Sequence, residues 1–197
     1  MKRAIVPLHR VAGTASEMSD EGLVAACATG ESAALGALYD RHADGVRRFL
    51  ARLAGTDDRD LDDLVQATFE QVVRAARNFD GRSAVRTWLI GIANNTARHH
   101  VRTEVRRRRL VEAAIDRPRV EAGDAVGEVL DRERAARLRD AIGSLPPKLR
   151  EAFVLVYLEG LSGAEVAQIV GAREGTIWKR LHEARAQLRD LLEGVRP

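Results

Sequence analysis

The stretch LSGAEVAQIVGAREGTIWKRLHEARAQLRDLL, residues 161–192, decides the fold of the C-terminal third of the chain. Ser162 and Glu165 have the spacing of a capping box, in which each side chain bonds the other residue's backbone N–H at a helix start. Gly171 predicts the end of that short helix, because glycine adopts the left-handed conformation at little cost. A second helix is expected from Thr176. Together these features predict a helix-turn-helix.

The second of these helices carries side chains suited to DNA. Its apolar positions are expected to face inward: Ile177, Leu181, Ala184, Leu188 and Leu191. Trp178, Lys179 and His182 then point away from the core, and Arg173 lies in the turn, where a phosphate would bind. The first turns of such a helix fit a major groove about 12 Å wide. A plain helical hairpin with a solvated charged face remains the alternative for this stretch alone.

Upstream, helical periodicity dominates and no strand alternation is sustained, so the predicted class is all-α. The clearest apolar stripe predicts a helix and repeats at helical spacing: Leu61, Leu64, Val65, Thr68, Phe69, Val72, Val73 and Ala76. We expect a flexible tail over residues 1–18, a helical domain over 19–109, a flexible acidic linker over 110–128 and a second helical domain over 129–193. Asp20 is expected at the start of the first helix, where it could act as the cap.

Composition excludes several classes of protein. The 197 residues include a single cysteine, Cys27, which rules out disulfide frameworks and cysteine-rich metal sites. No apolar run approaches the roughly 20 residues that span a bilayer, and the N-terminus lacks the apolar stretch of a signal peptide. We expect a cytoplasmic protein that needs no cofactor and no metal.

Charge is separated into blocks along the chain. Eight arginines and one acid lie between residues 82 and 109, a net charge of +7, although the whole chain carries only +3. An acidic run with five aspartates, Asp57–Asp63, precedes this block, and a second acidic stretch follows it. Such separation indicates several partners, at least one of them a polyanion.

The acidic run has three possible explanations. Aspartates favour helix N-termini because they cap and complement the helix dipole, which accounts for Asp60. Gln66 and Glu70 extend the polar stripe from Asp62 by two further turns, which favours a protein-binding face. A magnesium site is the third option, but Asp62 and its neighbour Asp63 diverge by about 100° on a helix and do not converge on one ion.

The arginine-rich block is predicted to be a helix from about residue 84 to 109 that binds nucleic acid in a salt-dependent way. Phe79 and Trp88 could stack on unpaired bases, or they could pack in the core. Asn94 and Arg98 fall on the side of the helix expected to face water. A helix after Pro146-Pro147 is expected to turn five residues inward: Leu149, Ala152, Phe153, Val156 and Tyr157.

Four segments in this order resemble bacterial sigma factors of the extracytoplasmic-function class of the sigma-70 family. They are DLDDLVQATF (residues 60–69), RTWLIGIANNTARHHVR (86–102), SLPPKLREAFVLVYLEGLSGAEVA (144–167) and GTIWKRLHEARAQL (175–188). The resemblance covers about residues 21–192. It implies a promoter-specificity subunit, without catalysis of its own, that binds core RNA polymerase.

The resemblance also implies site residues. Contacts to the clamp of the polymerase largest subunit are expected from Asp62, Asp63, Leu64, Val65, Gln66 and Glu70. Contacts to the melted minus-10 strand, including a flipped base, are expected from Phe79, Asp80, Arg82, Ser83, Arg86, Trp88, Asn94 and Arg98. Contacts to minus-35 duplex are expected from Arg173, Thr176, Trp178, Lys179, Arg180 and His182.

Two positions depart from many family members, which carry basic residues where this chain has Trp178 and Glu183. Phosphate contact should weaken at Glu183, and Trp178 could contact a thymine methyl or pack on sugar, so the usual minus-35 sequence is not expected. The implied partners are core polymerase (clamp and flap), promoter DNA and an anti-sigma factor, with no small-molecule substrate. The rival hypotheses are a stand-alone helix-turn-helix regulator and a metal-dependent nuclease that uses the aspartate cluster.

Overall fold

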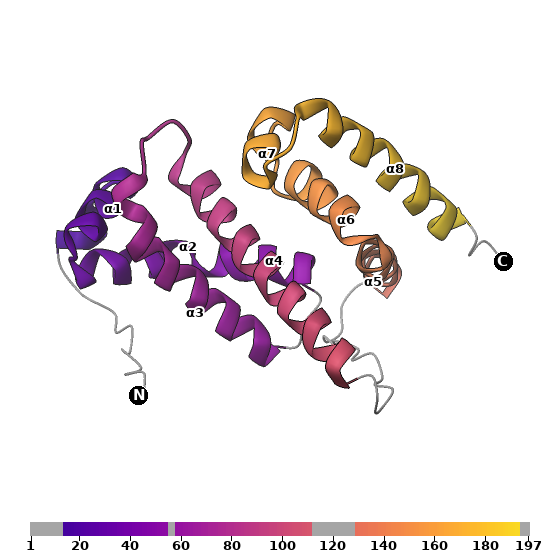
Figure 1. The fold of residues 1–197 in the computed structure, drawn as a ribbon, viewed down its shortest axis with the longest axis horizontal. Coiled ribbons are helices and arrows are strands. Elements are labelled where there is room, and N and C mark those ends of the chain that lie inside the picture. The colour runs from indigo at the N-terminus through magenta and orange to yellow at the C-terminus, as the bar shows by residue number, and fades with distance from the viewer. Residues whose placement is uncertain (1–13, 55–57, 112–128, 194–197) are drawn as a thin grey trace.

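The computed structural model describes residues 14–54, 58–111 and 129–193, and every regular element within these ranges is helical. The helices form two domains, one from each half of the chain, that lie against each other (Figure 1). The all-α prediction is confirmed. Of the predicted linker, residues 112–128 lie outside the described residues, as do residues 1–13 of the predicted tail. None of the described helices is long and apolar enough to cross a membrane.

The N-terminal domain is built on four helices: α1 (Asp20–Thr29), α2 (Ser32–Ala54), α3 (Asp58–Ala75) and α4 (Val85–Val111), with 3-10 turns at Thr14–Glu17 and Ala76–Asn78. Phe49, Phe69 and Leu89 are fully buried where α2, α3 and α4 meet. Tyr39 packs edge-on against Phe69, with ring centroids 4.8 Å apart. Val73, predicted to lie in the apolar stripe of α3, is 41% exposed. It sits at the edge of the stripe, about 100° around the helix from the buried Val72.

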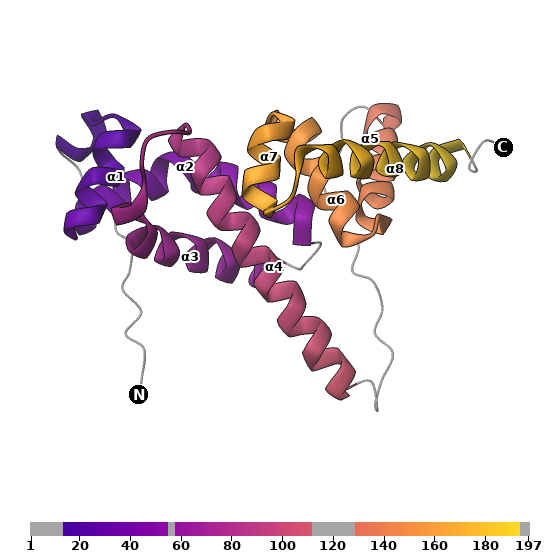
Figure 2. The same ribbon diagram turned by 45° about the horizontal axis from the view of Figure 1, so that its top comes forward.

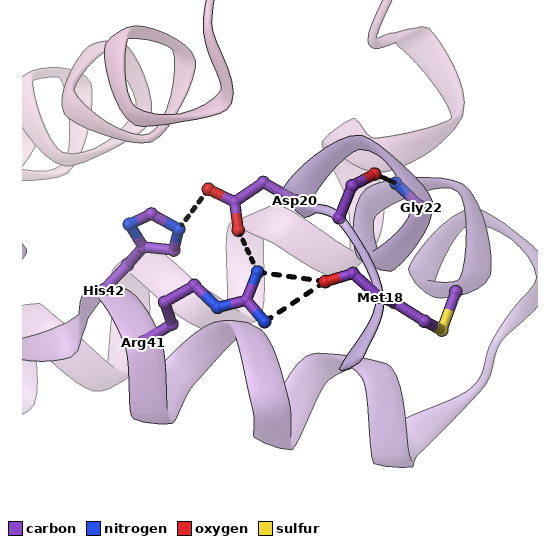
Figure 3. A network of polar contacts seen from close by, with 6 residues as sticks. Met18, Asp20, Gly22, Arg41 and His42 are labelled. Atoms are coloured by element: carbon purple, nitrogen blue, oxygen red, sulfur yellow. Dashed lines mark hydrogen bonds and ion pairs between the residues drawn. The ribbon is translucent and has the colours of Figure 1, made fainter. Parts of the chain in front are cut away.

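A polar network joins α1 to α2 (Figure 3). The Asp20 carboxylate accepts a hydrogen bond from Arg41 Nη1 at 2.5 Å and lies 2.8 Å from His42 Nε2. Arg41 also donates to the Met18 carbonyl at 3.1 and 3.2 Å. Two neighbouring residues of α2 therefore hold the first turn of α1 in place.

Ser19, and not Asp20, caps α1. The Ser19 hydroxyl accepts the backbone N–H of Gly22 at 3.1 Å, and Asp20 is the first helical residue. Partial burial by itself raises the pKa of Asp20, but the hydrogen bond from Arg41 and the interactions with His42 outweigh it and leave that pKa below its ordinary value. The charged form of Asp20 therefore stabilises the folded chain.

The C-terminal domain consists of α5 (Val129–Ser144), α6 (Pro147–Phe153), α7 (Gly163–Val170) and α8 (Glu174–Glu193), with a π-helical turn at Val154–Leu158. Pro147 occupies the first turn of α6, where a missing N–H costs nothing. In the π turn, the N–H of Glu159 bonds the carbonyl of Val154 at 3.0 Å. The wider turn rotates the chain, so Val154 is buried and Tyr157 is exposed, and the prediction that Tyr157 faces inward is wrong.

The helix-turn-helix forms as its sequence predicted. Both halves of the capping box are present, since Ser162 and Glu165 each bond the other's backbone N–H, and Gly171 ends α7 with a left-handed φ of 66°. Helix α8 begins at Glu174, two residues before the expected start. Four of its predicted inward positions are buried: Ile177, Leu181, Ala184 and Leu188. Leu191 is exposed, because α8 extends past Leu188, the last residue that other helices cover.

Helix α7 lies against α4 (Figures 1 and 2). Helix α2 contacts α5 and the π turn. Gly91 of α4 leaves room for Ile169 of α7, whose Cγ1 comes within 3.6 Å of the position that a Cβ would take. Arg150 of α6 reaches across and donates to the Leu53 carbonyl at 3.2 Å, and burial lowers the pKa of its guanidinium. The two domains therefore share one buried core in this structure.

The polar network at Asp20 has a measurable consequence for stability. A carboxyl whose pKa is lowered by folding stabilises the native state above its unfolded pKa, near 4, and loses that contribution as the pH falls through the folded pKa. We expect Asp20→Asn to lower the free energy of unfolding at pH 7 by up to about 1 kcal/mol. The difference should shrink steadily below pH 4 in urea titrations.

Asp40→Asn, at an exposed carboxylate of the same helix as Arg41, is the control and should change stability little at either pH. A deficit for Asp20→Asn that stayed constant from pH 7 to pH 3 would contradict an electrostatic origin.

Candidate nucleic-acid interface

Helix α3 presents a polar surface to solvent, made of Asp62, Asp63, Gln66 and Glu70. Gln66 Nε2 donates to Glu70 Oε1 at 3.3 Å, and Asp62 is paired with Arg47 of α2. All four side chains are exposed, so the spacing places them on an accessible face. The described residues hold no group of three or more His, Cys, Asp or Glu side chains that could bind a metal ion.

Leu64 and Val65, which the resemblance also places among the expected polymerase contacts, are each only 4% exposed and belong to the core. They lie on the opposite side of α3 from the polar surface. A side chain beneath the domain surface positions α3, and the polar residues of this helix are the ones open to a partner.

The loop between α3 and α4 is shaped by Asp80. Its carboxylate accepts the backbone N–H of Arg82 at 3.1 Å, which closes a turn over Gly81, whose φ is 71°. That backbone hydrogen bond, with the charge of Arg82, lowers the pKa of Asp80. Arg82 and Asp80 also form an ion pair at 2.5 Å, and the Arg82 side chain is the more exposed of the two. The loop therefore keeps a fixed shape and projects a guanidinium into solvent, beside the half-buried Ser83.

Phe79 and Trp88 contact each other at the base of this loop, with ring centroids 5.0 Å apart and planes inclined by 52°. Both residues are half-buried and pack against the core. The structure thus combines the two options left open by the sequence: the rings pack inward, and part of the pair stays at the surface.

The C-terminal domain covers the middle of α4. Asn94 is fully buried, and its Nδ2 donates to Glu151 Oε1 at 2.9 Å. Arg98 Nε pairs with the same oxygen at 3.1 Å, and Arg98 Nη1 donates to the Val170 carbonyl at 3.3 Å. The prediction that Asn94 faces water is wrong. The polar side of α4, which the sequence pattern assigned to solvent, is covered by α6 and α7.

A second cluster lies nearer the start of α4. Glu159, at the end of the π turn, accepts from Arg86 Nη2 at 2.6 Å and from Arg52 Nη1 at 3.0 Å, and its carbonyl accepts from Arg86 Nη1 at 3.2 Å. Thr87 donates to Glu165 Oε1 at 3.4 Å. The hydrogen bonds from Ser162 chiefly hold the pKa of Glu165 below its ordinary value.

Sequence reasoning missed Glu151 and Glu159. One signal was available: each acid lies beside apolar residues of a helix. Glu151 precedes the buried Ala152, and Glu159 directly follows the π turn. That signal shows an acid near the core, but it does not identify the arginines that pair with it.

The start of α8 is open to solvent. Arg173, Thr176, Lys179 and His182 are exposed, and Lys179 lies 3.9 Å from Glu183 on the next turn. Arg180 differs from the others because it is half-buried and its Nη1 has no partner among the described residues. These four expected contact residues are thus accessible, as is Trp178, and Arg180 is only partly so.

Trp178 is held in one orientation and remains 49% exposed. Its indole N–H donates to Glu174 Oε1 at 3.2 Å. The ring lies over Gly163 at the start of α7, so closely that an added Cβ would come within 3.0 Å of it. Trp178 therefore presents an apolar ring on the surface of the helix-turn-helix, with its one polar group already bonded.

Family comparisons cover most of the chain. The family model for Sigma-70 region 2 matches residues 38–107, and that for Sigma-70, region 4, matches residues 135–188. The chain is 39% identical over 185 residues to the ECF RNA polymerase sigma factor SigE of Mycolicibacterium smegmatis, an alignment that covers 89% of this chain and 70% of that protein.

Two solved structures share the fold. CnrH in complex with the cytosolic domain of CnrY has a TM-score of 0.64 at 29% identity, over 90% of this chain and 99% of CnrH. The sigma factor RpoE in complex with the anti-sigma factor NepR from Bartonella quintana has a TM-score of 0.66 at 24% identity, over 80% and 96% of the two chains.

Proposed function

The chain belongs to the sigma-70 family as an extracytoplasmic-function sigma factor, which directs RNA polymerase to promoters, and from this premise we propose how its surfaces divide that task. Residues 19–109 form the domain for core polymerase and minus-10 DNA. Residues 129–193 form the domain for minus-35 DNA and the polymerase flap, and residues 110–128 connect the two. The observation that carries the proposal is the presence, in one chain, of an exposed acidic and amide face on α3 and an open basic start of α8.

The polymerase clamp binds the polar surface of α3 through Asp62, Asp63, Gln66 and Glu70. Two properties support this assignment: all four side chains are exposed, and the buried Leu64 on the opposite side anchors the helix. An exposed, closely spaced set of carboxylates and an amide suits a basic protein partner.

The loop and helix α4 bind the melted minus-10 strand. Asp80 and Arg82 shape the loop and provide its charge, and the pair of Phe79 and Trp88 offers a partly exposed stacking surface at its base. Further contacts come from the loop hydroxyl and the polar side chains along α4: Ser83, Arg86, Asn94 and Arg98. The last two become available only after the C-terminal domain moves away from α4.

The start of α8 enters the major groove at the minus-35 site. Arg173, Thr176, Lys179 and His182 supply contacts to phosphates and base edges, with Arg180 at their margin. Trp178 reads a thymine methyl group, because its indole N–H is already donated to Glu174 and only its apolar ring remains. The thymine methyl is the apolar group that a base pair displays in the major groove.

The protein acts without catalysis of its own, without a small-molecule substrate, and in the cytoplasm. An anti-sigma factor is proposed as a further partner. The support is a protein of the same fold, RpoE of Bartonella quintana, whose structure was solved with the anti-sigma factor NepR.

Run-off transcription tests the function as a whole. Purified core RNA polymerase with this chain should start transcription at discrete sites on a library of genomic fragments, and core enzyme alone should not. Transcripts identical with and without the chain would contradict the proposal. Tight binding to an operator without polymerase would instead support a stand-alone regulator.

Changing the polar surface of α3 should weaken polymerase binding. We expect Asp63→Ala with Gln66→Ala to raise the Kd for core enzyme by about tenfold or more, since two polar contacts near the centre of an interface commonly contribute this much. Glu21→Ala with Asn78→Ala, an exposed acid and an exposed amide of the N-terminal domain that lie outside α3, is the matched control. Equal affinities for the two double variants, with unchanged circular dichroism, would contradict the clamp assignment.

Trp178 should give the minus-35 site a measurable dependence on thymine. Replacing each thymine of that site with deoxyuridine, which lacks only the methyl group, should weaken binding of the wild-type holoenzyme about threefold to tenfold at one position. Trp178→Ala should lose this discrimination at the same position, because no apolar ring faces the methyl group. Lys148→Ala, at an exposed lysine of α6, should retain it. A wild-type profile without any deoxyuridine effect would indicate that Trp178 packs on sugar.

A further inference from the structure

We infer that the N-terminal domain binds a free nucleotide, with guanine as the preferred base, in a pocket between α2 and α4. The pocket has a volume of about 370 Å³, and its lining comes from the middle of α2 and the first turns of α4. Small-molecule sites in proteins commonly occupy about 300–1,000 Å³ and combine apolar walls with a few convergent polar groups. This pocket has the size and the mixed lining of such a site.

The inner wall of the pocket is apolar. Val46 of α2 and Leu89 and Ile90 of α4 form it, and each is at most 2% exposed. These side chains belong to the core of the domain, so they give the wall a fixed shape. A flat body such as a nucleobase releases water from this wall when it binds, whereas a hydrated inorganic ion gains nothing there.

The rim of the pocket is cationic and partly fixed in place. The carboxylate of Asp20 holds Arg41 and His42, at 2.5 and 2.8 Å (Figure 3). Arg86, across the pocket on α4, is bonded to the C-terminal domain. Arg48 is exposed and has no hydrogen bond or ion pair within the described part of the chain. Its guanidinium is therefore available to a phosphate, which such a group binds with two parallel N–H donors.

An acid on the same rim disfavours a ligand that is anionic throughout. Asp44 lies four residues before Arg48, a spacing at which opposite charges on a helix commonly pair. Both side chains line the pocket, and no ion pair joins them among the described residues. Asp44 therefore keeps a carboxylate that can only accept hydrogen bonds, and the ligand must supply the donors. Guanine offers two adjacent N–H groups on one edge, one for each carboxylate oxygen, whereas adenine offers a single amino group.

Gly45 leaves the space beside the backbone of α2 open. Glycine inside a helix is markedly less favourable than alanine, so its presence calls for a reason. Close packing is not that reason, because no described atom lies within 4 Å of the position that a Cβ would take. Gly45 does line the pocket. A ligand that approaches the helix backbone accounts for a glycine at this position.

The pocket is separate from the surfaces proposed for polymerase and minus-35 DNA. The polar surface of α3 and the start of α8 contribute none of its lining. Of the residues proposed to contact the minus-10 strand, only Arg86 also lines the pocket. The nucleotide is therefore an effector that is bound and not transformed, and it is compatible with polymerase on α3.

Isothermal titration calorimetry of the full-length chain with GDP tests the inference. We expect a single GDP to bind about tenfold more tightly than ADP, because a site that accepts two N–H groups discriminates against a base that lacks one of them. Asp44→Asn should remove this preference. Arg48→Ala should weaken GDP binding about tenfold, through the lost phosphate contact. The matched controls, Asp40→Asn and Arg74→Ala, lie at exposed residues of the same domain outside the pocket and should change neither value.

Filling the pocket provides a second test. Gly45→Leu should abolish GDP binding and keep the helical circular dichroism of the wild type, since leucine favours a helix. Gly143→Leu is the control, because this glycine of α5 also has no described atom within 4 Å of its Cβ position. Wild-type affinity for GDP in Gly45→Leu would overturn the inference. Equal affinities of the wild-type chain for GDP and inorganic pyrophosphate would also overturn it, because the arginines alone would then explain binding.

A base within a DNA strand offers the same chemistry as a free nucleotide, so the two sources must be separated. A short fluorescein-labelled single strand of mixed sequence, titrated with the same variants, does this. We expect Gly45→Leu to leave the affinity for the strand unchanged. Loss of strand binding in Gly45→Leu, together with no binding of GDP to the wild type, would overturn the inference and assign the pocket to the path of the DNA.

Discussion

The pairing of two buried carboxylates with the arginines of the opposite domain determines how the halves of this molecule lie together. Apolar contact between the domains exists, as at Ile169 and Gly91, but apolar surfaces alone do not specify one orientation. Glu151 and Glu159 do specify one, because each must meet a donor at hydrogen-bond distance or remain a buried, uncompensated charge. The interdomain geometry therefore depends on a few directional contacts at α4.

These contacts also have a built-in weakness. Asn94 Oδ1 and Arg150 Nε are buried at or near the contact without a hydrogen-bond partner in the described part of the chain. A buried polar atom left unpaired costs about 1–3 kcal/mol, which reduces the net stability of the closed arrangement. A surface that satisfied every polar group would hold the domains together more strongly. The contact is thus specific in its geometry and limited in its strength, as a reversible association requires.

Signals confined to a few neighbouring residues predicted the fold well. The capping box at Ser162 and Glu165 and the left-handed Gly171 were confirmed, because the interactions that stabilise them span only a few residues. The π turn at Val154–Leu158 was not predicted. A period of 3.6 residues per turn assigns certain positions to the core, and a wider turn moves some of them to the surface. The exposure of Leu191 could not be predicted either, because it depends on where other helices stop covering α8.

The candidate sites show the same division between local and long-range information. The spacing of Asp62, Gln66 and Glu70 correctly placed an exposed polar face on α3, whereas the motif that included Leu64 mixed surface and core residues. The burial of Asn94 could not be predicted from the pattern of its own helix, because its partner Glu151 is 57 residues away along the chain. A polar side chain on a helical face predicts a partner but does not say which one. For α4 the same donors suit a carboxylate and a phosphate, so the residues that define a DNA-binding face also make that face available to acids of the same chain.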